Sequence, residues 1–255
     1  MVDVLDIFKK YNIGYQIHKT DLFKHALKTD IDHFQIFLGS MIRPVIKKFT
    51  EDEIKQLTTI CASKNVYVHS AYMVSLSSPL GYKTKEYAIE YIQDILHLCD
   101  KIGVIGFVIH TGYGGIKRLQ YITSVISKYV KDNQIKCKIL IETPSDMVKS
   151  KVKDNIFDSL ADFIKFYKTL DKNIFKIAYD TAHVYLSGYD PYEALLYAEK
   201  ECKDCVYLCH FNNVVSDTKD EHTIKGMIHD KTMLDVSKYC FDNEIPMIYE
   251  KYVKL

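Results

Sequence analysis

Residues 104–110 read Val-Ile-Gly-Phe-Val-Ile-His, and residues 137–142 read Cys-Lys-Ile-Leu-Ile-Glu. Each is an apolar run with the length of a buried strand, and each ends in a side chain that can bind a metal ion. Between them, residues 117–130 place apolar side chains at helical spacing. Two apolar runs joined by an amphipathic stretch are typical of two parallel strands connected by a helix.

The same alternation covers most of the chain. Apolar runs span residues 13–18, 33–38, 65–69, 104–110, 137–142, 175–180, 205–210 and 246–250. Amphipathic stretches span residues 21–28, 51–63, 85–101, 117–130, 159–170, 191–201 and 231–241. Eight strands alternating with helices predict a single α/β domain over residues 1–255, folded as a TIM (β/α)8 barrel. An open doubly wound sheet is the alternative, but no Gly-x-Gly-x-x-Gly motif follows the first run, which weighs against a dinucleotide-binding sheet.

The two ends of the chain modify this expectation. The last apolar run ends five residues before Leu255, so we expect a barrel that lacks the C-terminal eighth helix. A short amphipathic segment, residues 3–11, precedes the first run. Because strands one and eight are neighbours in a closed barrel, we predict that this N-terminal helix covers the groove that the eighth helix would fill.

The composition limits the class of protein. Hydrophobic residues make up 47% of the chain, charged residues make up 26%, and the formal net charge is +1. This composition excludes a disordered chain, and the small net charge disfavours nucleic-acid binding through bulk electrostatics. The sequence has neither a run of about 18 apolar residues nor a signal peptide, so we expect no membrane association. We expect an intracellular protein of the cytoplasm or nucleus, from a cell or a virus, with reduced cysteines. We infer no obligate protein partner.

Six of the eight apolar runs end in a histidine or a carboxylate. These residues are His69, His110, Glu142, Asp180, His210 and Glu250, and three further candidates, His183, Asp220 and His222, follow the sixth and seventh runs. In a barrel the carboxyl ends of the strands meet at one mouth, where the chemistry of this fold takes place. Buried charges need cations, and His with carboxylates but no Cys favours zinc or manganese. Any one of these residues alone is more often structural, so the prediction depends on the set.

The stretches around these candidates resemble the signatures of the endonuclease IV family of apurinic/apyrimidinic endonucleases, also called AP endonuclease family 2. The matching stretches are Val68-His69-Ser70-Ala71-Tyr72, His110-Thr111-Gly112, Ile141-Glu142-Thr143, Asp180-Thr181-Ala182-His183, His210-Phe211-Asn212-Asn213, Asp220-Glu221-His222 and Tyr249-Glu250. All nine candidate positions carry the family's residue type, in order. Ser70, Thr111 and Gln16 depart from the usual Ala, Pro and His, and the missing helix makes this a shortened member.

The resemblance implies a trinuclear zinc site, with manganese as an alternative at one position. It assigns His69, His110 and Glu142 to the first zinc, Glu142, Asp180, His210 and Glu250 to the second, and His183, Asp220 and His222 to the third, with Glu142 as the catalytic bridging residue. The implied reaction belongs to base-excision repair. It hydrolyses the phosphodiester 5′ to an abasic site in double-stranded DNA, leaving a 3′-hydroxyl and a 5′-deoxyribose phosphate. Zinc lowers the pKa of bound water to about 7, so no protein nucleophile is needed. By position, Arg43, Tyr72 and Met73 match the side chains that the family inserts into DNA.

Two other functions remain open at this point. A sugar-phosphate isomerase or epimerase of the xylose-isomerase-like type uses one divalent metal, which Glu142, Asp180, His210 and Glu250 could hold. That function leaves the other candidate ligands without a metal, which disfavours it. A DNA-binding scaffold without activity is disfavoured because no candidate ligand is lost and the net charge is only +1.

Overall fold

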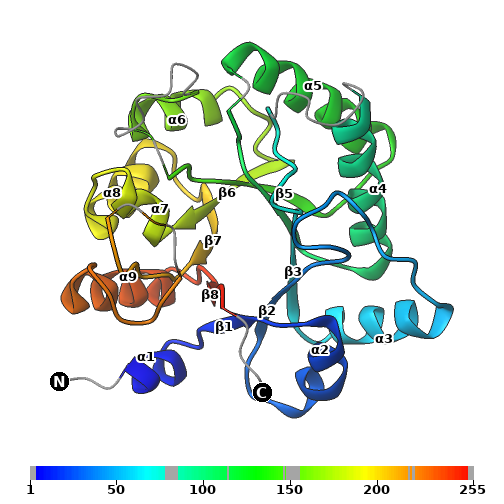
Figure 1. Ribbon diagram of the computed structural model, residues 1–255, viewed down its shortest axis with the longest axis horizontal. Helices are drawn as coiled ribbons and strands as arrows, with labels where there is room; N and C mark the ends of the chain where they lie inside the picture. Colours follow the sequence, from blue (N-terminus) through cyan, green and yellow to red (C-terminus); the bar gives the residue numbers. More distant parts are fainter. Residues whose placement is uncertain are drawn as a thin grey trace.

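Eight parallel strands close into a barrel in the order of the chain (Figure 1). The structure is a computed structural model that describes residues 4–77, 86–113, 115–145, 147, 156–217, 219 and 222–251. The strands are β1 Gly14–Gln16, β2 His33–Ile36, β3 Asn65–His69, β4 Gly106–Ile109, β5 Lys138–Glu142, β6 Phe175–Asp180, β7 Val206–His210 and β8 Met247–Tyr249. The predicted TIM barrel is confirmed, and every strand falls within a predicted apolar run.

Helices surround the barrel as an outer ring (Figure 1). They are α1 Val4–Lys10, α2 Lys19–His25, η1 Ala26–Lys28, α3 Glu51–Cys61, α4 Glu86–Ile102, α5 Ile116–Asp132, α6 Leu160–Tyr167, α7 Thr181–Leu186, α8 Pro191–Glu201 and α9 Asp230–Asp242. Thr50 and Glu53 form a capping box at the start of α3, and Asp190 caps α8. The apolar periodicity does not predict α7, because this short helix begins directly after β6 and its apolar residues continue those of the strand.

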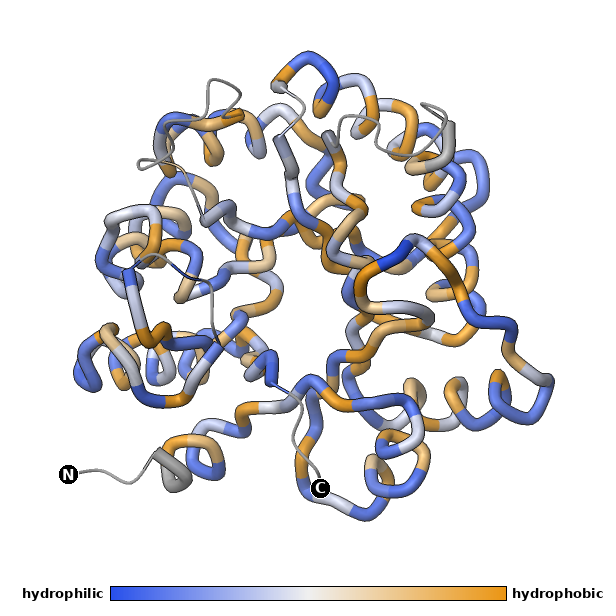
Figure 2. The backbone as a smooth tube through the Cα atoms, in the orientation of Figure 1, coloured by the Kyte–Doolittle hydropathy of each residue, from blue (hydrophilic) through white to orange (hydrophobic). Residues whose placement is uncertain are grey.

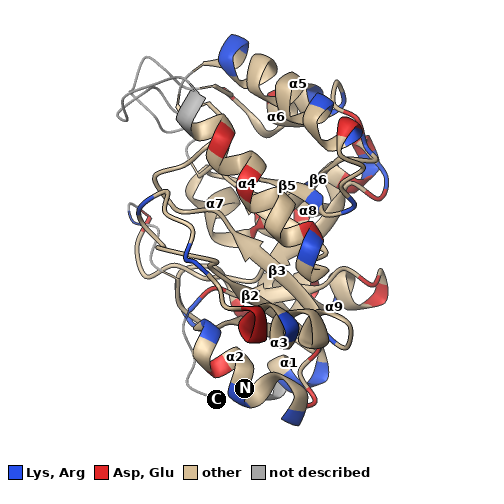
Figure 3. Cartoon of the chain, turned by 90° about the vertical axis from the view of Figure 1, so that its right-hand side faces the viewer, with Lys and Arg blue, Asp and Glu red and all other residues tan. Residues whose placement is uncertain are grey.

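The apolar residues form two layers. The inner layer fills the barrel with Tyr67, Val108, Leu140, Ala178, Leu208 and Ile248. The outer layer lies between the strands and the helices, where α5 contributes Leu119, Ile122 and Ile126. Figure 2 shows polar and apolar residues alternating along the outer helices, and Figure 3 shows most charged residues on those helices and on the loops. Among the described residues, no helix combines the length and the hydropathy of a membrane span.

The first helix packs where β8 meets β1. In this strand pair Tyr15 lies opposite Tyr249. The buried ring of Phe8, on α1, lies 5.6 Å from each of these two rings, stacked on Tyr15 and edge-on to Tyr249. The predicted N-terminal helix is therefore confirmed, and it contacts β8. The described residues end at Lys251, two positions after β8, and they include no helix after this strand.

Candidate metal centre

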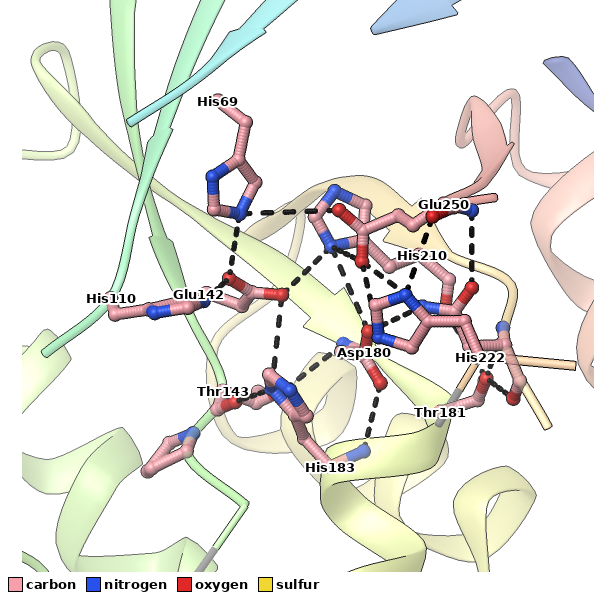
Figure 4. A network of polar contacts seen from close by, with 12 residues as sticks. His69, His110, Glu142, Thr143, Asp180, Thr181, His183, His210, His222 and Glu250 are labelled. Carbon is pink, nitrogen blue, oxygen red and sulfur yellow. Dashed lines mark hydrogen bonds and ion pairs between the residues drawn. The ribbon is translucent and has the colours of Figure 1, made fainter. Parts of the chain in front are cut away.

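The candidate ligands meet because of strand periodicity. The residue two positions before each strand-end ligand belongs to the inner layer, as Tyr67 does before His69 and Leu140 does before Glu142. Side chains alternate along a strand, so residues two apart point to the same side. Each candidate at a strand end therefore points into the barrel mouth, directly above the inner apolar layer. Figure 4 shows these side chains converging from different strands.

A first donor group contains His69, His110 and Glu142, which lie close enough to share one ion. Oε2 of Glu142 lies 3.3 Å from Nε2 of His69 and 2.7 Å from Nε2 of His110. Oε1 of the same carboxylate lies 2.8 Å from Nδ1 of His210. Because the two oxygens of Glu142 face different imidazoles, this carboxylate has the geometry to bridge two metal ions.

A second donor group joins Glu142, Asp180, His210 and Glu250, all of them buried. Nδ1 of His210 lies 3.1 Å from Oε2 of Glu250 and 3.7 Å from Oδ2 of Asp180. Three carboxylates therefore surround one ring nitrogen. The predicted second set of ligands is brought together in full.

A third donor group contains Asp180, His183 and His222. Oδ1 of Asp180 accepts a hydrogen bond of 2.8 Å from the backbone N–H of His183, so the carboxylate caps α7 as well. This cap places His183 in the first turn of the helix, beside the mouth. Asp220, the remaining candidate, lies outside the described residues. The motifs assign Asp180 to the second group alone, whereas the structure places it in the third group too.

In the described part of the chain, imidazoles are the ionisable partners that lie against the buried carboxylates of the three groups. Among the described residues, no lysine or arginine forms an ion pair with Glu142, Asp180 or Glu250. Burial alone would raise the pKa of Glu142, but His110 and His210 hold this pKa well below its usual range. Burial alone would lower the pKa of His210, but Glu250 and Glu142 raise it well above its ordinary value. A divalent cation can replace the proton that His210 holds among these carboxylates. The histidine and carboxylate donors fit zinc.

Two buried amides hold the carboxylates in place. Nδ2 of Asn212 donates to Oδ2 of Asp180 at 2.7 Å and to Oε2 of Glu250 at 3.0 Å. Nε2 of Gln35 donates to Oε1 of Glu250 at 2.6 Å. The sequence reasoning assigned neither amide a role. The signal for Gln35 is a polar residue inside a buried apolar strand, because a buried amide requires partners.

The three predicted DNA contacts lie on two loops that are joined to each other. The backbone N–H of Tyr72 donates to the carbonyl of Met41 at 2.8 Å, and that of Met73 donates to the carbonyl of Ile42 at 3.2 Å. Tyr72 and Met73 are 40% and 45% exposed, and the side chain of Arg43 is exposed. The structure thus exposes the aromatic ring of Tyr72, the thioether of Met73 and the guanidinium of Arg43 on these two joined loops.

A cavity of about 370 Å³ opens beside the first and third groups. Its lining includes Tyr72, His110, Glu142, Thr143, Tyr113 and His183. One wall passes through Gly112, which has a φ of +78°, and a Cβ there would lie 1.9 Å from Oγ of Ser75. The cavity wall therefore requires glycine at this position.

A comparison with protein families agrees with the fold. A family model described as a xylose isomerase-like TIM barrel matches residues 23–233. The chain belongs to this family. The chain is similar in sequence to two proteins named as endonucleases and similar in structure to a third.

Apurinic-apyrimidinic endonuclease 1 of Saccharomyces cerevisiae is 27% identical to this chain over 179 residues, which are 65% of this chain and 46% of that protein. Probable endonuclease 4 of Campylobacter fetus subsp. fetus is 25% identical over 177 residues, which are 65% of this chain and 60% of that protein. The chain thus spans less than two thirds of the length of either relative. Endonuclease IV from Thermus thermophilus superposes with a TM-score of 0.77 at 18% identity, covering 94% of this chain and 93% of that one, which shows a shared fold. The resemblance to endonuclease IV is confirmed by these matches.

Proposed function

We propose that this protein is a metal-dependent endonuclease that hydrolyses the phosphodiester 5′ to abasic sites in double-stranded DNA. One observation carries the proposal: the three donor groups are continuous, since Glu142 belongs to the first and second and Asp180 to the second and third. A row of three metal positions suits a phosphodiester, because the attacking oxygen, the leaving oxygen and the remaining phosphate charge each need stabilisation. The sequence similarity to two proteins named as endonucleases supports the same reaction.

In this proposal the three donor groups would each hold one zinc ion, with manganese as an alternative at one position. When bound, zinc supplies Lewis-acid activation of water and neutralises phosphate charge. Glu142 would contribute to both the first and the second positions, because each of its oxygens faces a different imidazole. Asp180 connects the second position to His183 and His222, and Asp220 completes the third position in the proposal.

The exposed loop residues account for DNA binding in this proposal. Tyr72 and Met73 present flat or flexible apolar surface that can enter a base stack, and Arg43 presents a cation for the phosphate backbone. Extrusion of a nucleotide costs least where the base is already missing, and the cavity beside the ligands can receive the sugar. Binding through these local contacts is consistent with a net charge of only +1.

The second donor group by itself favours another function. Two glutamates, one aspartate and one histidine match the one-metal site of sugar-phosphate isomerases and epimerases. That function uses neither the first nor the third group, so it predicts one metal ion per chain instead of three.

An incision assay tests the proposal. The substrate is an end-labelled duplex with one tetrahydrofuran abasic analogue, and the purified protein is assayed with and without a chelator. We expect a single cut 5′ to the analogue that leaves a 3′-hydroxyl, which a polymerase can extend, and we expect the chelator to abolish it. Elemental analysis should find close to three metals per chain. One metal per chain with no incision would favour the isomerase.

A further inference from the structure

The imidazoles of the metal centre do not all present the same nitrogen to it. Nδ1 of His69 lies 2.7 Å from the carbonyl of Ser70, and Nδ1 of His183 lies 2.8 Å from the carbonyl of Thr143. A carbonyl oxygen can only accept a hydrogen bond, so Nδ1 carries the proton in both rings. The nitrogen that can offer a lone pair to a metal is therefore Nε2 in His69 and in His183.

His210 has the opposite arrangement. Its Nε2 lies 2.9 Å from Oε1 of Gln35, whereas its Nδ1 faces the carboxylates of Glu142 and Glu250 at 2.8 and 3.1 Å. An amide oxygen can only accept, so Nε2 carries the proton and Nδ1 is the nitrogen that points toward the metal position. Backbone carbonyls set the tautomer of His69 and His183, but a side chain sets it here.

The orientation of the Gln35 amide is determined by its other contacts. Nε2 of Gln35 donates to Oε1 of Glu250 at 2.6 Å and to Oε1 of Gln16 at 3.0 Å. A flipped amide would place its own oxygen against the carboxylate of Glu250, which only accepts, and would lose this hydrogen bond. Gln16 and Gln35 lie directly opposite each other on β1 and β2, and both are fully or almost fully buried, so bulk water does not replace these bonds.

We infer that Gln35, oriented by Glu250 and supported by Gln16, is a positioning residue that makes His210 bind metal through Nδ1 and holds Glu250 in the same group. The inference rests on the metal-binding part of the proposed function and is independent of which DNA lesion is cut. Amides of this kind act through the ligands, and their loss typically weakens metal affinity about 10- to 100-fold. The inference also gives a role to Gln16, which stands where the endonuclease IV family usually has histidine.

Nitrogen-15 spectroscopy of the zinc-loaded wild-type protein tests the tautomer without a substitution. The histidine ring nitrogens are assigned, and their shifts identify which nitrogen binds zinc and which carries a proton. We expect His210 to bind through Nδ1 with the proton on Nε2, and His69 and His183 to show the reverse. Zinc on Nε2 of His210 would overturn this inference alone. Failure to bind zinc would overturn the proposed function as well.

Two substitutions test the coupling of the amides. Gln35→Leu removes the donor and the acceptor at similar volume, and we expect zinc affinity, measured by competition with a chromophoric chelator, to fall about 10- to 100-fold. Gln16→Leu should have a smaller effect, and it should add nothing in the Gln35→Leu background because Gln16 acts through Gln35. Additive losses in the double variant would contradict the inference, as would unchanged affinity in Gln35→Leu.

A measurement on metal-free protein separates positioning from folding. Gln35→Leu leaves the buried partners of the amide without their hydrogen bonds, so the melting temperature of the chelated protein should fall to some extent. A positioning role requires the zinc affinity of the folded variant to fall as well. Gln56→Leu, at an exposed position on α3, is the matched control and should change neither quantity. If Gln35→Leu lowers the metal-free melting temperature and leaves the zinc affinity intact, Gln35 is structural and the inference is wrong.

Discussion

Oε1 of Glu142 lies 2.8 Å from Nδ1 of His210, although 68 residues separate the two side chains in the chain. They come from β5 and β7, and both are buried at the barrel mouth. The other carboxylate oxygen faces the first donor group, so Glu142 connects the first and second donor groups. The predictions below follow from this connection, from the groups that hold it and from the surface beside it.

Glu142→Gln should separate the metal chemistry from the fold. The amide keeps the shape of the side chain but replaces one oxygen by an N–H group, which cannot bridge two cations. We expect abasic-site incision to fall by at least about 100-fold, the size seen when one preorganised electrostatic group is lost. Incision rate, metal content and circular dichroism are measured together. Glu90→Gln, at an exposed position on α4, is the control. Full activity in Glu142→Gln would contradict the bridging role.

Asn212→Ala should weaken the metal centre without removing a ligand. Asn212 donates to Asp180 and to Glu250, so its loss frees two carboxylates that must stay in place for the second and third positions. We expect metal affinity to fall about 10- to 100-fold, measured by titration against a competing chelator. The control is Asn133→Ala at the exposed end of α5, which should bind metal normally. Normal metal affinity in Asn212→Ala would show that Asp180 and Glu250 keep their positions without the amide of Asn212.

The stability of the metal-free protein should depend on pH through His210 and Glu142. The raised pKa of His210 contributes stability that is complete below 6.5 and is lost as pH rises through the folded-state pKa. The lowered pKa of Glu142 contributes stability that is present above 4.5 and is lost as pH falls through its folded-state pKa. We therefore expect the melting temperature of chelated protein to be highest between these two values and to fall above pH 6.5.

Metal should reverse the alkaline half of this profile. A bound cation would take the place of the Nδ1 proton of His210, so we expect metal affinity to increase as pH rises. Thermal melts from pH 4 to 9, with and without chelator, give the comparison. His97→Gln, at an exposed position on α4, should leave both profiles unchanged. A chelated protein that gains stability between pH 6.5 and 9 would contradict the assigned charge state.

Tyr72→Ala should weaken DNA binding while leaving the metal centre intact. Base–aromatic stacking contributes about 1–3 kcal/mol per base, so we expect binding of an abasic duplex to weaken by that amount, measured by fluorescence anisotropy. Tyr121→Ala, at a position that is 62% exposed on the outer helix α5, is the matched control. If the two variants bind the abasic duplex equally well, Tyr72 does not belong to the DNA-binding surface. If Tyr72→Ala loses bound metal, the ring of Tyr72 instead supports the rings of His69 and His110, which it contacts.

Much of the barrel could be predicted from local patterns. The runs ending at His69 and Asp180 coincide with β3 and β6, because a buried strand has a simple apolar signature with a defined length. The helix α7 could not be predicted in this way. Its six residues continue the apolar pattern of β6, and its start depends on the Asp180 carboxylate accepting from the N–H of His183.

Local patterns of the chain identify the candidate donors and place six of them at the ends of strand runs, because strand length and the period of two are local properties. How these donors are shared between groups follows from the three-dimensional arrangement of the strands. The split of Glu142 between two groups, the entry of Asp180 into a third and the choice of Nδ1 in His210 depend on distances between strands far apart in the chain. No local pattern encodes those distances, since closure of the barrel and the packing of its inner layer set them.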